Sequence, residues 1–248
     1  MSQSETWKTV GILGGMGAEA GVELARRLIY LSGARTDSEQ IPCLLYTNPC
    51  VPDRTENLLH GGPSPLDELV RSLQVLVDAG AELVCIPCNT AHAWHEELSR
   101  RIDVPVVHMI RAMARSHDRL LGDRVGVLCT TGLTRVGLYQ SCCAEEHLEA
   151  IMPTEEELEG LVMRAIYGDL DRGLVGLKGS NKDQTIVRLM WEAGQRLIDR
   201  GASALWLACT EISLIKEELI DLSPVPVVDA MDVLGEELVR LARRDAGD

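Results

Sequence analysis

Two of the eight cysteines in this 248-residue chain occupy matching places. A shift of 121 positions superimposes Cys88 on Cys209, and it matches 11 of the 33 residues from Asp78 to Ile110 without a gap. Unrelated segments would match at only a few positions. The chain therefore contains an internal duplication, and the two cysteines are its equivalent members.

Two equivalent thiols suit one reaction in particular, the inversion of a stereocentre by proton transfer. Such a reaction needs a base on one face of the carbon and an acid on the other, and the two roles exchange in the reverse direction. A thiol that lies at a helix N-terminus has a lowered pKa and can serve in either role. Hydrogen bonds to the substrate carboxylate must also stabilise carbanion character. Asn89, Thr90 and Thr210 adjoin the cysteines and are candidates for this task.

The segments around the cysteines predict the elements that position them. Apolar runs and turn residues predict strands at Val10–Leu13, Leu44–Thr47, Leu83–Ile86, Val104–His108 and Leu205–Leu207. Amphipathic spacing predicts helices at Ala18–Leu31, Leu66–Asp78 and Ala91–Arg101. Such alternation favours parallel sheets covered by helices, whose ligands bind beyond the carboxyl ends of the strands. Each cysteine is expected at such a strand end.

The duplication and the alternation together predict an α/β fold of two similar flavodoxin-like parallel-sheet domains, related by a pseudo-two-fold axis. The first domain is expected over residues 1–113 plus 224–248, and the second over 114–223. The strand Val225–Val228 is expected to cross back to the first domain. The two thiols would then face one interdomain cleft.

Composition excludes several classes of function. The net charge of −14 would repel nucleic acid, and no apolar run of about 18 residues predicts a membrane span. The start of the chain lacks a basic segment followed by an apolar one, so secretion is not expected. We therefore expect a cytoplasmic protein with free thiols rather than disulfides, and with no nucleic-acid or membrane partner.

Four segments carry a family resemblance. Pro87-Cys88-Asn89-Thr90-Ala91-His92 and Ala208-Cys209-Thr210-Glu211-Ile212 resemble the two signature segments of the aspartate/glutamate racemase family. Gly11-Ile12-Leu13-Gly14-Gly15-Met16-Gly17 and Asn48-Pro49-Cys50-Val51-Pro52-Asp53-Arg54-Thr55 resemble its amino-terminal and arginine-bearing loops. The resemblance covers nearly the whole chain, and Glu211 after Cys209-Thr210 favours the aspartate racemase branch.

The resemblance implies a homodimeric enzyme that needs neither pyridoxal phosphate nor a metal, and that racemises aspartate or glutamate by two-base proton transfer. Cys88 and Cys209 are its expected catalytic residues, while Arg54 and Lys178 are expected to bind the side-chain carboxylate. The expected substrate-binding residues are Met16, Arg54, Asn89, Thr90, Thr130, Thr131, Lys178 and Thr210.

One position departs from the family pattern and keeps other substrates open. Leu133 stands where relatives commonly have a threonine, so Thr131 or Thr134 would have to supply the hydroxyl. If neither does, a broad-specificity racemase becomes an alternative. A hydantoin racemase, a maleate isomerase, an arylmalonate decarboxylase and a catalytically silent amino-acid-binding protein also remain alternatives within this fold.

Two weaker motifs suggest other kinds of site. Gly15-Met16-Gly17-Ala18-Glu19-Ala20 fits a dinucleotide-binding pattern, with Asp37 about 20 residues further on. Cys85 and Cys88, followed by His92 and His95, suggest a zinc or redox site. Neither motif explains the duplicated cysteine, so the racemase interpretation is preferred and no metal is expected.

Overall fold

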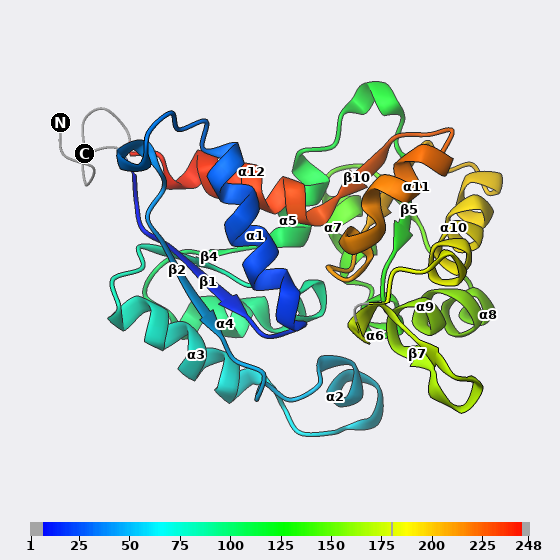
Figure 1. Ribbon diagram of the computed structural model, residues 1–248, viewed down its shortest axis with the longest axis horizontal. Coiled ribbons are helices and arrows are strands. Elements are labelled where there is room, and N and C mark those ends of the chain that lie inside the picture. Colours follow the sequence, from blue (N-terminus) through cyan, green and yellow to red (C-terminus); the bar gives the residue numbers. More distant parts are fainter. Residues whose placement is uncertain (1–6, 180, 245–248) are drawn as a thin grey trace. The chain divides into compact units, whose positions relative to one another are not determined.

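The computed structural model describes residues 7–179 and 181–244 and divides into two compact units. The first unit consists of Met1–Ala112 and Met231–Asp248, and the second of Met113–Ala230. Each unit contains one four-stranded sheet whose strand pairs are all parallel, with helices packed against it (Figure 1). The predicted α/β class and its duplication are confirmed.

The first unit has the strand order β2-β1-β3-β4. Its strands are β1 (Val10–Gly14), β2 (Cys43–Thr47), β3 (Leu83–Cys85) and β4 (Val106–Val107). Its helices are α1 (Ala18–Leu31), η2 (Asp37–Glu39), α2 (Arg54–His60), α3 (Leu66–Asp78), η3 (Asn89–Trp94), α4 (His95–Arg101), α5 (Met109–Arg115, which continues into the second unit) and α12 (Ala230–Ala242). The predicted helix Ala91–Arg101 is in fact the 3₁₀ helix η3 followed by α4.

The second unit has the strand order β10-β9-β5-β6, which is the same topology with each strand replaced by its duplicate. Its strands are β5 (Arg124–Leu128), β6 (Glu149–Ile151), β9 (Ala204–Leu207) and β10 (Val227–Asp229), with a hairpin of β7 (Gly168–Asp169) and β8 (Leu174–Val175). Its α-helices are α6 (Thr131–Val136), α7 (Leu138–Glu145), α8 (Glu155–Glu157), α9 (Arg164–Tyr167), α10 (Gln184–Asp199) and α11 (Lys216–Leu222). Its other helices are η4 (Arg119–Leu121), η5 (Leu158–Met163), η6 (Leu170–Arg172), η7 (Leu177–Gly179) and η8 (Ile212–Ile215).

The expectation that Val225–Val228 joins the first domain is wrong. Strand β10 pairs with β9 in the second unit, with Val227 opposite Leu205 and Val228 opposite Trp206. This register repeats that of β4 on β3, where Val106 lies opposite Val84. The second unit accordingly extends to Ala230, beyond the expected boundary at residue 223.

The central strand pairs show that the duplication reaches the packing of single atoms. Val10 lies opposite Leu83 in the first unit, and the duplicated residues Val125 and Ala204 lie opposite each other in the second. A Cβ added to Gly11 would lie 2.9 Å from Ala81 Cβ and 3.2 Å from Leu76 Cβ. One added to Gly126 would meet the duplicates of both residues. The glycine therefore lets a helix and the loop after that helix approach the strand closely in each unit.

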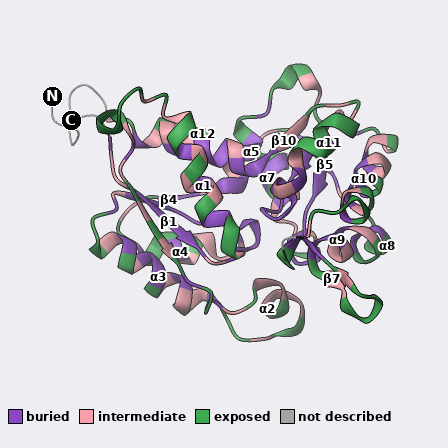
Figure 2. Ribbon diagram, in the orientation of Figure 1, coloured by how far each residue is buried: buried purple, intermediate pink, exposed green. Residues whose placement is uncertain are grey.

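Buried strands carry the loops that hold the candidate site residues. All five residues of β1 and all four of β9 are buried, as are the three of β3 (Figure 2). Each cysteine belongs to the hydrophobic core cluster of its own unit. The backbone leading to each thiol is therefore fixed by packing, which is the first requirement of a pre-organised site.

Candidate active site

Cys88 follows β3 in the first unit and begins η3. Its side chain is buried, with a relative exposure of 6%. Its own N–H donates to the Ile86 carbonyl at 2.7 Å, and its carbonyl accepts from Ala91 N–H at 3.2 Å. Asn89 and Thr90 form the first turn of η3 and are also buried. These three consecutive residues thus form one buried loop at the end of β3.

His92 connects this loop to the first residue of α5. Its Nδ1 donates to the Cys88 carbonyl at 3.0 Å, and its Nε2 accepts from Met109 N–H at 3.1 Å. The contact with Met109 requires a neutral ring, because Nε2 can accept only when it carries no proton. Burial lowers the pKa of His92 from 6.5 to about 4, which favours that neutral form. His92 therefore acts on the Cys88 backbone and not on the thiol.

Three histidines gather behind the Cys88 loop. The His108 ring lies 4.3 Å from that of His95 and 5.1 Å from that of His92, measured between centroids. Burial lowers the pKa of all three. His95 donates to the Val106 carbonyl, and His108 accepts from Arg111 N–H. No group of three or more potential metal ligands is found among the residues that the structure describes.

Met16 and Arg54 are placed by two other loops of the first unit. Met16 follows β1, is buried, and belongs to the same core cluster as Cys88. The preceding Gly15 has φ of +102°, and a Cβ there would lie 2.3 Å from the Asn48 carbonyl oxygen, so only glycine fits this turn. Arg54 begins α2, whose first turn is capped by Asp53, and α2 contacts η3.

Arg54 is half-buried, and its guanidinium donates to the carbonyls of Val51 and Pro52 at 3.2 and 3.0 Å. These bonds hold the charged group over its own loop. Arg54, which the resemblance assigns to a carboxylate, therefore lies on a helix that contacts η3, the helix that follows Cys88.

Cys209 follows β9 in the second unit and is buried to the same extent as Cys88, with 6% exposure. Its thiol donates to Glu211 Oε2 at 3.0 Å, and the Thr210 hydroxyl donates to the same oxygen at 3.3 Å. Burial and the charge on Glu211 raise the pKa of the Cys209 thiol well above its ordinary range. The expectation that the helix start lowers this pKa is therefore wrong for Cys209, since η8 begins only at Ile212 and a buried carboxylate adjoins the sulfur.

In the sequence Glu211 marks the aspartate branch, and nothing in the motif alone predicts its contact with the thiol. The 121-residue shift offered a signal, because it places Glu211 on Thr90. A carboxylate on one thiol loop and a hydroxyl on the other make the two loops chemically unequal.

The threonines that follow β5 are engaged within the second unit. The Thr131 hydroxyl donates to Glu159 Oε1 at 3.0 Å, and Thr134 donates to the Thr130 carbonyl at 3.3 Å. Thr130 is buried at the start of α6, while Leu133 is fully buried. Leu133 therefore serves as a core residue, and a substrate would have to compete with Glu159 for the Thr131 hydroxyl.

Lys178 lies in η7, with its ammonium 4.1 Å from the centroid of the Tyr167 ring. Its positive charge acts on Cys209, where it opposes the upward shift of the thiol pKa. The resemblance predicts that Lys178 binds the side-chain carboxylate. The structure brings it into electrostatic range of the second unit's thiol.

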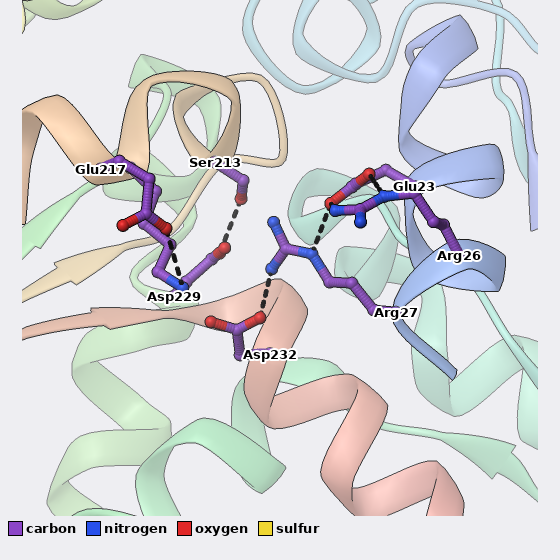
Figure 3. Close-up of polar contacts among 8 residues, drawn as sticks. Glu23, Arg26, Arg27, Ser213, Glu217, Asp229 and Asp232 are labelled. Carbon is purple, nitrogen blue, oxygen red and sulfur yellow. Dashed lines mark hydrogen bonds and ion pairs between the residues drawn. The ribbon is translucent and has the colours of Figure 1, made fainter. Parts of the chain in front are cut away.

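The polar residues behind the Cys209 loop occupy the positions of the histidines in the first unit. Ser213, Lys216 and Asp229 are the duplicates of His92, His95 and His108. Ser213 donates to Asp229 Oδ1 at 2.6 Å (Figure 3). In the first unit the same figure shows Arg27 of α1 bound to Asp232 of α12 at 2.6 Å. Each unit thus has its own polar interactions between side chains from different elements.

A family model described as Asp/Glu/Hydantoin racemase matches residues 13–238. The chain belongs to this family. It is 22% identical over 245 residues to the broad specificity amino-acid racemase RacX of Bacillus subtilis. The aligned region covers 93% of this chain and 96% of that protein. A glutamate racemase of Corynebacterium kroppenstedtii is 27% identical over 188 residues, which are 73% of this chain and 61% of that protein.

The solved structure of Picrophilus torridus aspartate racemase is similar throughout. It has a TM-score of 0.73 and 25% identity, and the match covers 96% of this chain and 95% of that one. Family membership confirms the predicted class of enzyme, an amino-acid racemase. Within residues 7–179 and 181–244, no helix has the length and apolar character needed to cross a membrane.

Proposed function

We propose that this racemase interconverts the L and D forms of aspartate or glutamate by moving the α-proton between Cys88 and Cys209. The observation that carries the proposal is the equivalence of the two thiols. Both are buried, and both follow the central strands β3 and β9 at duplicated positions. A symmetric proton exchange needs two such groups of the same chemical kind.

The mechanism requires both units to present their sulfur atoms to one α-carbon. The thiolate of one cysteine removes the α-proton, and the thiol of the other delivers its own proton to the opposite face. Each sulfur would lie about 3.5 Å from the carbon, so the sulfurs would be about 7 Å apart with substrate bound. The chemistry assigned to these residues needs no pyridoxal phosphate.

The remaining site residues are assigned to binding. Asn89 and Thr90 adjoin Cys88 and would hold the α-carboxylate, which strengthens as an acceptor when the proton leaves. Thr210 adjoins Cys209, and its hydroxyl would have to exchange its hydrogen bond to Glu211 for one to the α-carboxylate. Arg54 and Lys178 would bind the side-chain carboxylate. Met16 would line the site, and Thr130 and Thr131 would contribute polar contacts. We further propose a cytoplasmic homodimer.

A broad-specificity racemase is the second candidate, and two observations favour it. Leu133 is buried in the core, and the Thr131 hydroxyl is already bound to Glu159. The similarity to RacX also covers 96% of that protein. Such a racemase would act on amino acids other than aspartate and glutamate.

The deciding experiment incubates the purified protein with each L-amino acid in D₂O, without added cofactor, and follows loss of the α-proton by NMR. Rapid exchange confined to aspartate or glutamate supports the proposal, whereas comparable exchange of many amino acids supports broad specificity. No exchange of any amino acid would refute racemase activity on free amino acids.

The R54A variant tests the substrate's side-chain carboxylate separately. We expect its KM for aspartate or glutamate to rise by about tenfold or more, because a charge-assisted hydrogen bond to the side-chain carboxylate is lost. Its KM for alanine, which lacks that carboxylate, should not change if alanine is a substrate. An unchanged KM for the acidic substrate would show that its side chain is bound elsewhere.

A further inference from the structure

The two thiols of the proposed mechanism differ in their hydrogen-bonding partners. Cys209 donates to a buried carboxylate oxygen of Glu211 at 3.0 Å, and Glu211 itself is only 9% exposed. The duplicated position beside Cys88 is Thr90, which has no charge. The duplication therefore supplied two equal thiols, and Glu211 makes them unequal.

The geometry fixes which state of Cys209 the loop accommodates. A carboxylate oxygen can only accept, so the contact requires the proton on sulfur. The Thr210 hydroxyl donates to the same Glu211 oxygen at 3.3 Å, which keeps that oxygen aimed at the loop. A thiolate at Cys209 would replace an S–H donor with a negative charge facing a buried negative charge.

We propose that Glu211 is a positioning residue that assigns the resting proton to Cys209, so that the second unit's thiol enters catalysis as the acid. This inference rests on the two-cysteine function proposed above. Cys88 is then the first base. The enantiomer whose α-proton faces Cys88 meets an enzyme that is ready to react. The opposite enantiomer first requires a proton to pass from Cys209 to Cys88.

The proton balance follows from this assignment. In the forward step the Cα–H bond breaks as an S–H bond forms at Cys88, and the Cys209 S–H bond breaks as a new Cα–H bond forms on the other face. The free enzyme is left with a thiol at Cys88 and a thiolate at Cys209. Repulsion from Glu211 favours return to the resting state, in which Cys88 loses one proton and Cys209 gains one.

The test measures thiol protonation directly, without substrate. The wild-type chain and the E211Q variant are treated with iodoacetamide across a range of pH, and labelling of the Cys88 and Cys209 peptides is followed by mass spectrometry. Only the thiolate reacts. Glutamine keeps the size and the hydrogen-bond acceptor of the side chain but removes its charge.

We expect Cys209 in E211Q to be labelled about tenfold faster or more at pH 7, which corresponds to a pKa fall of one unit or more. The Cys88 labelling rate serves as the internal reference and should stay the same. The matched control is E159Q, which removes a carboxylate bound to Thr131 in the same unit and should leave Cys209 labelling unchanged. Equal Cys209 rates in E211Q and wild type, or equal acceleration in both variants, would overturn the proposal.

Two further measurements keep the inference testable if E211Q does not fold. In the wild-type chain, the pH of half-maximal labelling of Cys209 should exceed that of the exposed Cys50. Equal or lower values at Cys209 would contradict the proposal. In the E211D variant, which keeps the carboxylate, Cys209 should remain harder to label than Cys50.

Catalysis gives an independent readout, because the pH profile of kcat/KM reports the ionisations of the free enzyme. Since Cys209 must carry a proton, its lowered pKa in E211Q should move the alkaline limb of the profile to lower pH. An unmoved limb would contradict the role of Glu211 in catalysis. Failure of the two-cysteine function would instead appear as racemisation retained in C209A, a result that leaves the labelling data unaffected.

Discussion

The two cysteine loops share a backbone frame but differ in almost every polar contact around it. Strand register, the close approach at Gly11 and Gly126, and the burial of both thiols are the same in the two units. In the first unit a neutral histidine holds the loop backbone through the Cys88 carbonyl. In the second unit a carboxylate binds the thiol itself. The frame determines where the thiols lie, and the hydrogen bond to Glu211 distinguishes Cys209 from Cys88.

The largest expected effect tests whether racemisation needs both thiols. C88A and C209A should each reduce racemisation by about 10³-fold or more, because each removes one of the two proton-transfer groups. Each variant should still exchange the α-proton of one enantiomer in D₂O, and the enantiomer should differ between them. Polarimetry measures the racemisation, and NMR in D₂O measures the exchange of the α-proton.

The matched control for this pair is C143A, which removes a buried cysteine of α7. It should retain racemisation. Substantial racemisation in either C88A or C209A would show that the duplicated thiols are not both proton carriers, and the comparison between the loops would lose its functional meaning.

The sequence predicted the sheet architecture and the thiol positions because both depend on backbone periodicity. The 121-residue shift carries the register of β3 and β4 directly onto β9 and β10. It could also have prevented the misplacement of Val225–Val228, since the duplicates of these residues lie in the first unit's own sheet. That error came from expecting a chain crossover, which local sequence patterns do not encode.

The protonation of the thiols could not be predicted in the same way. A helix start was expected to favour a thiolate at Cys209, but the carboxylate of Glu211 adjoins this thiol. Which side-chain rotamer Glu211 adopts depends on packing and on Thr210, and spacing alone does not specify it. The cation–π contact of Lys178 with Tyr167 depends on a hairpin of two-residue strands that the sequence did not reveal.

The next prediction concerns the histidine tie, which only the first unit possesses. The pKa of His92 falls from 6.5 in an unfolded chain to about 4 in the folded protein, because the ring is buried. Between these values the unfolded state binds a proton that the folded state does not. Stability is therefore full above pH 6.5 and declines as the pH falls toward 4, by about 3 kcal/mol from this residue.

Urea unfolding of wild type and H92N at pH 7 and pH 4.5 measures this difference. H92N should lose less stability than wild type over the interval, with a remaining slope from His95 and His108, whose pKa values are also lowered. The control in the second unit is G160A, at a position where an added Cβ has no atom within 4 Å, and it should keep the wild-type pH dependence. If H92N kept the wild-type pH dependence, His92 would not contribute to the loss of stability at low pH.

The smallest expected effect tests the close packing at Gly11 and Gly126, which the two units share. In G11A the new Cβ would lie 2.9 Å from Ala81 Cβ, and in G126A it would lie 2.9 Å from Leu197 Cβ. Because both positions are buried against backbone-fixed atoms, each substitution should destabilise the protein by about 1–3 kcal/mol. The two losses should be similar, since the neighbouring residues are duplicates. Gly160 lies within η5 and has no atom within 4 Å of an added Cβ, so G160A should not destabilise the protein and should stabilise it by up to about 1 kcal/mol. If G126A kept the wild-type stability while G11A did not, the close packing at the glycine would not be shared by the two units. Only the strand register would then be common to both.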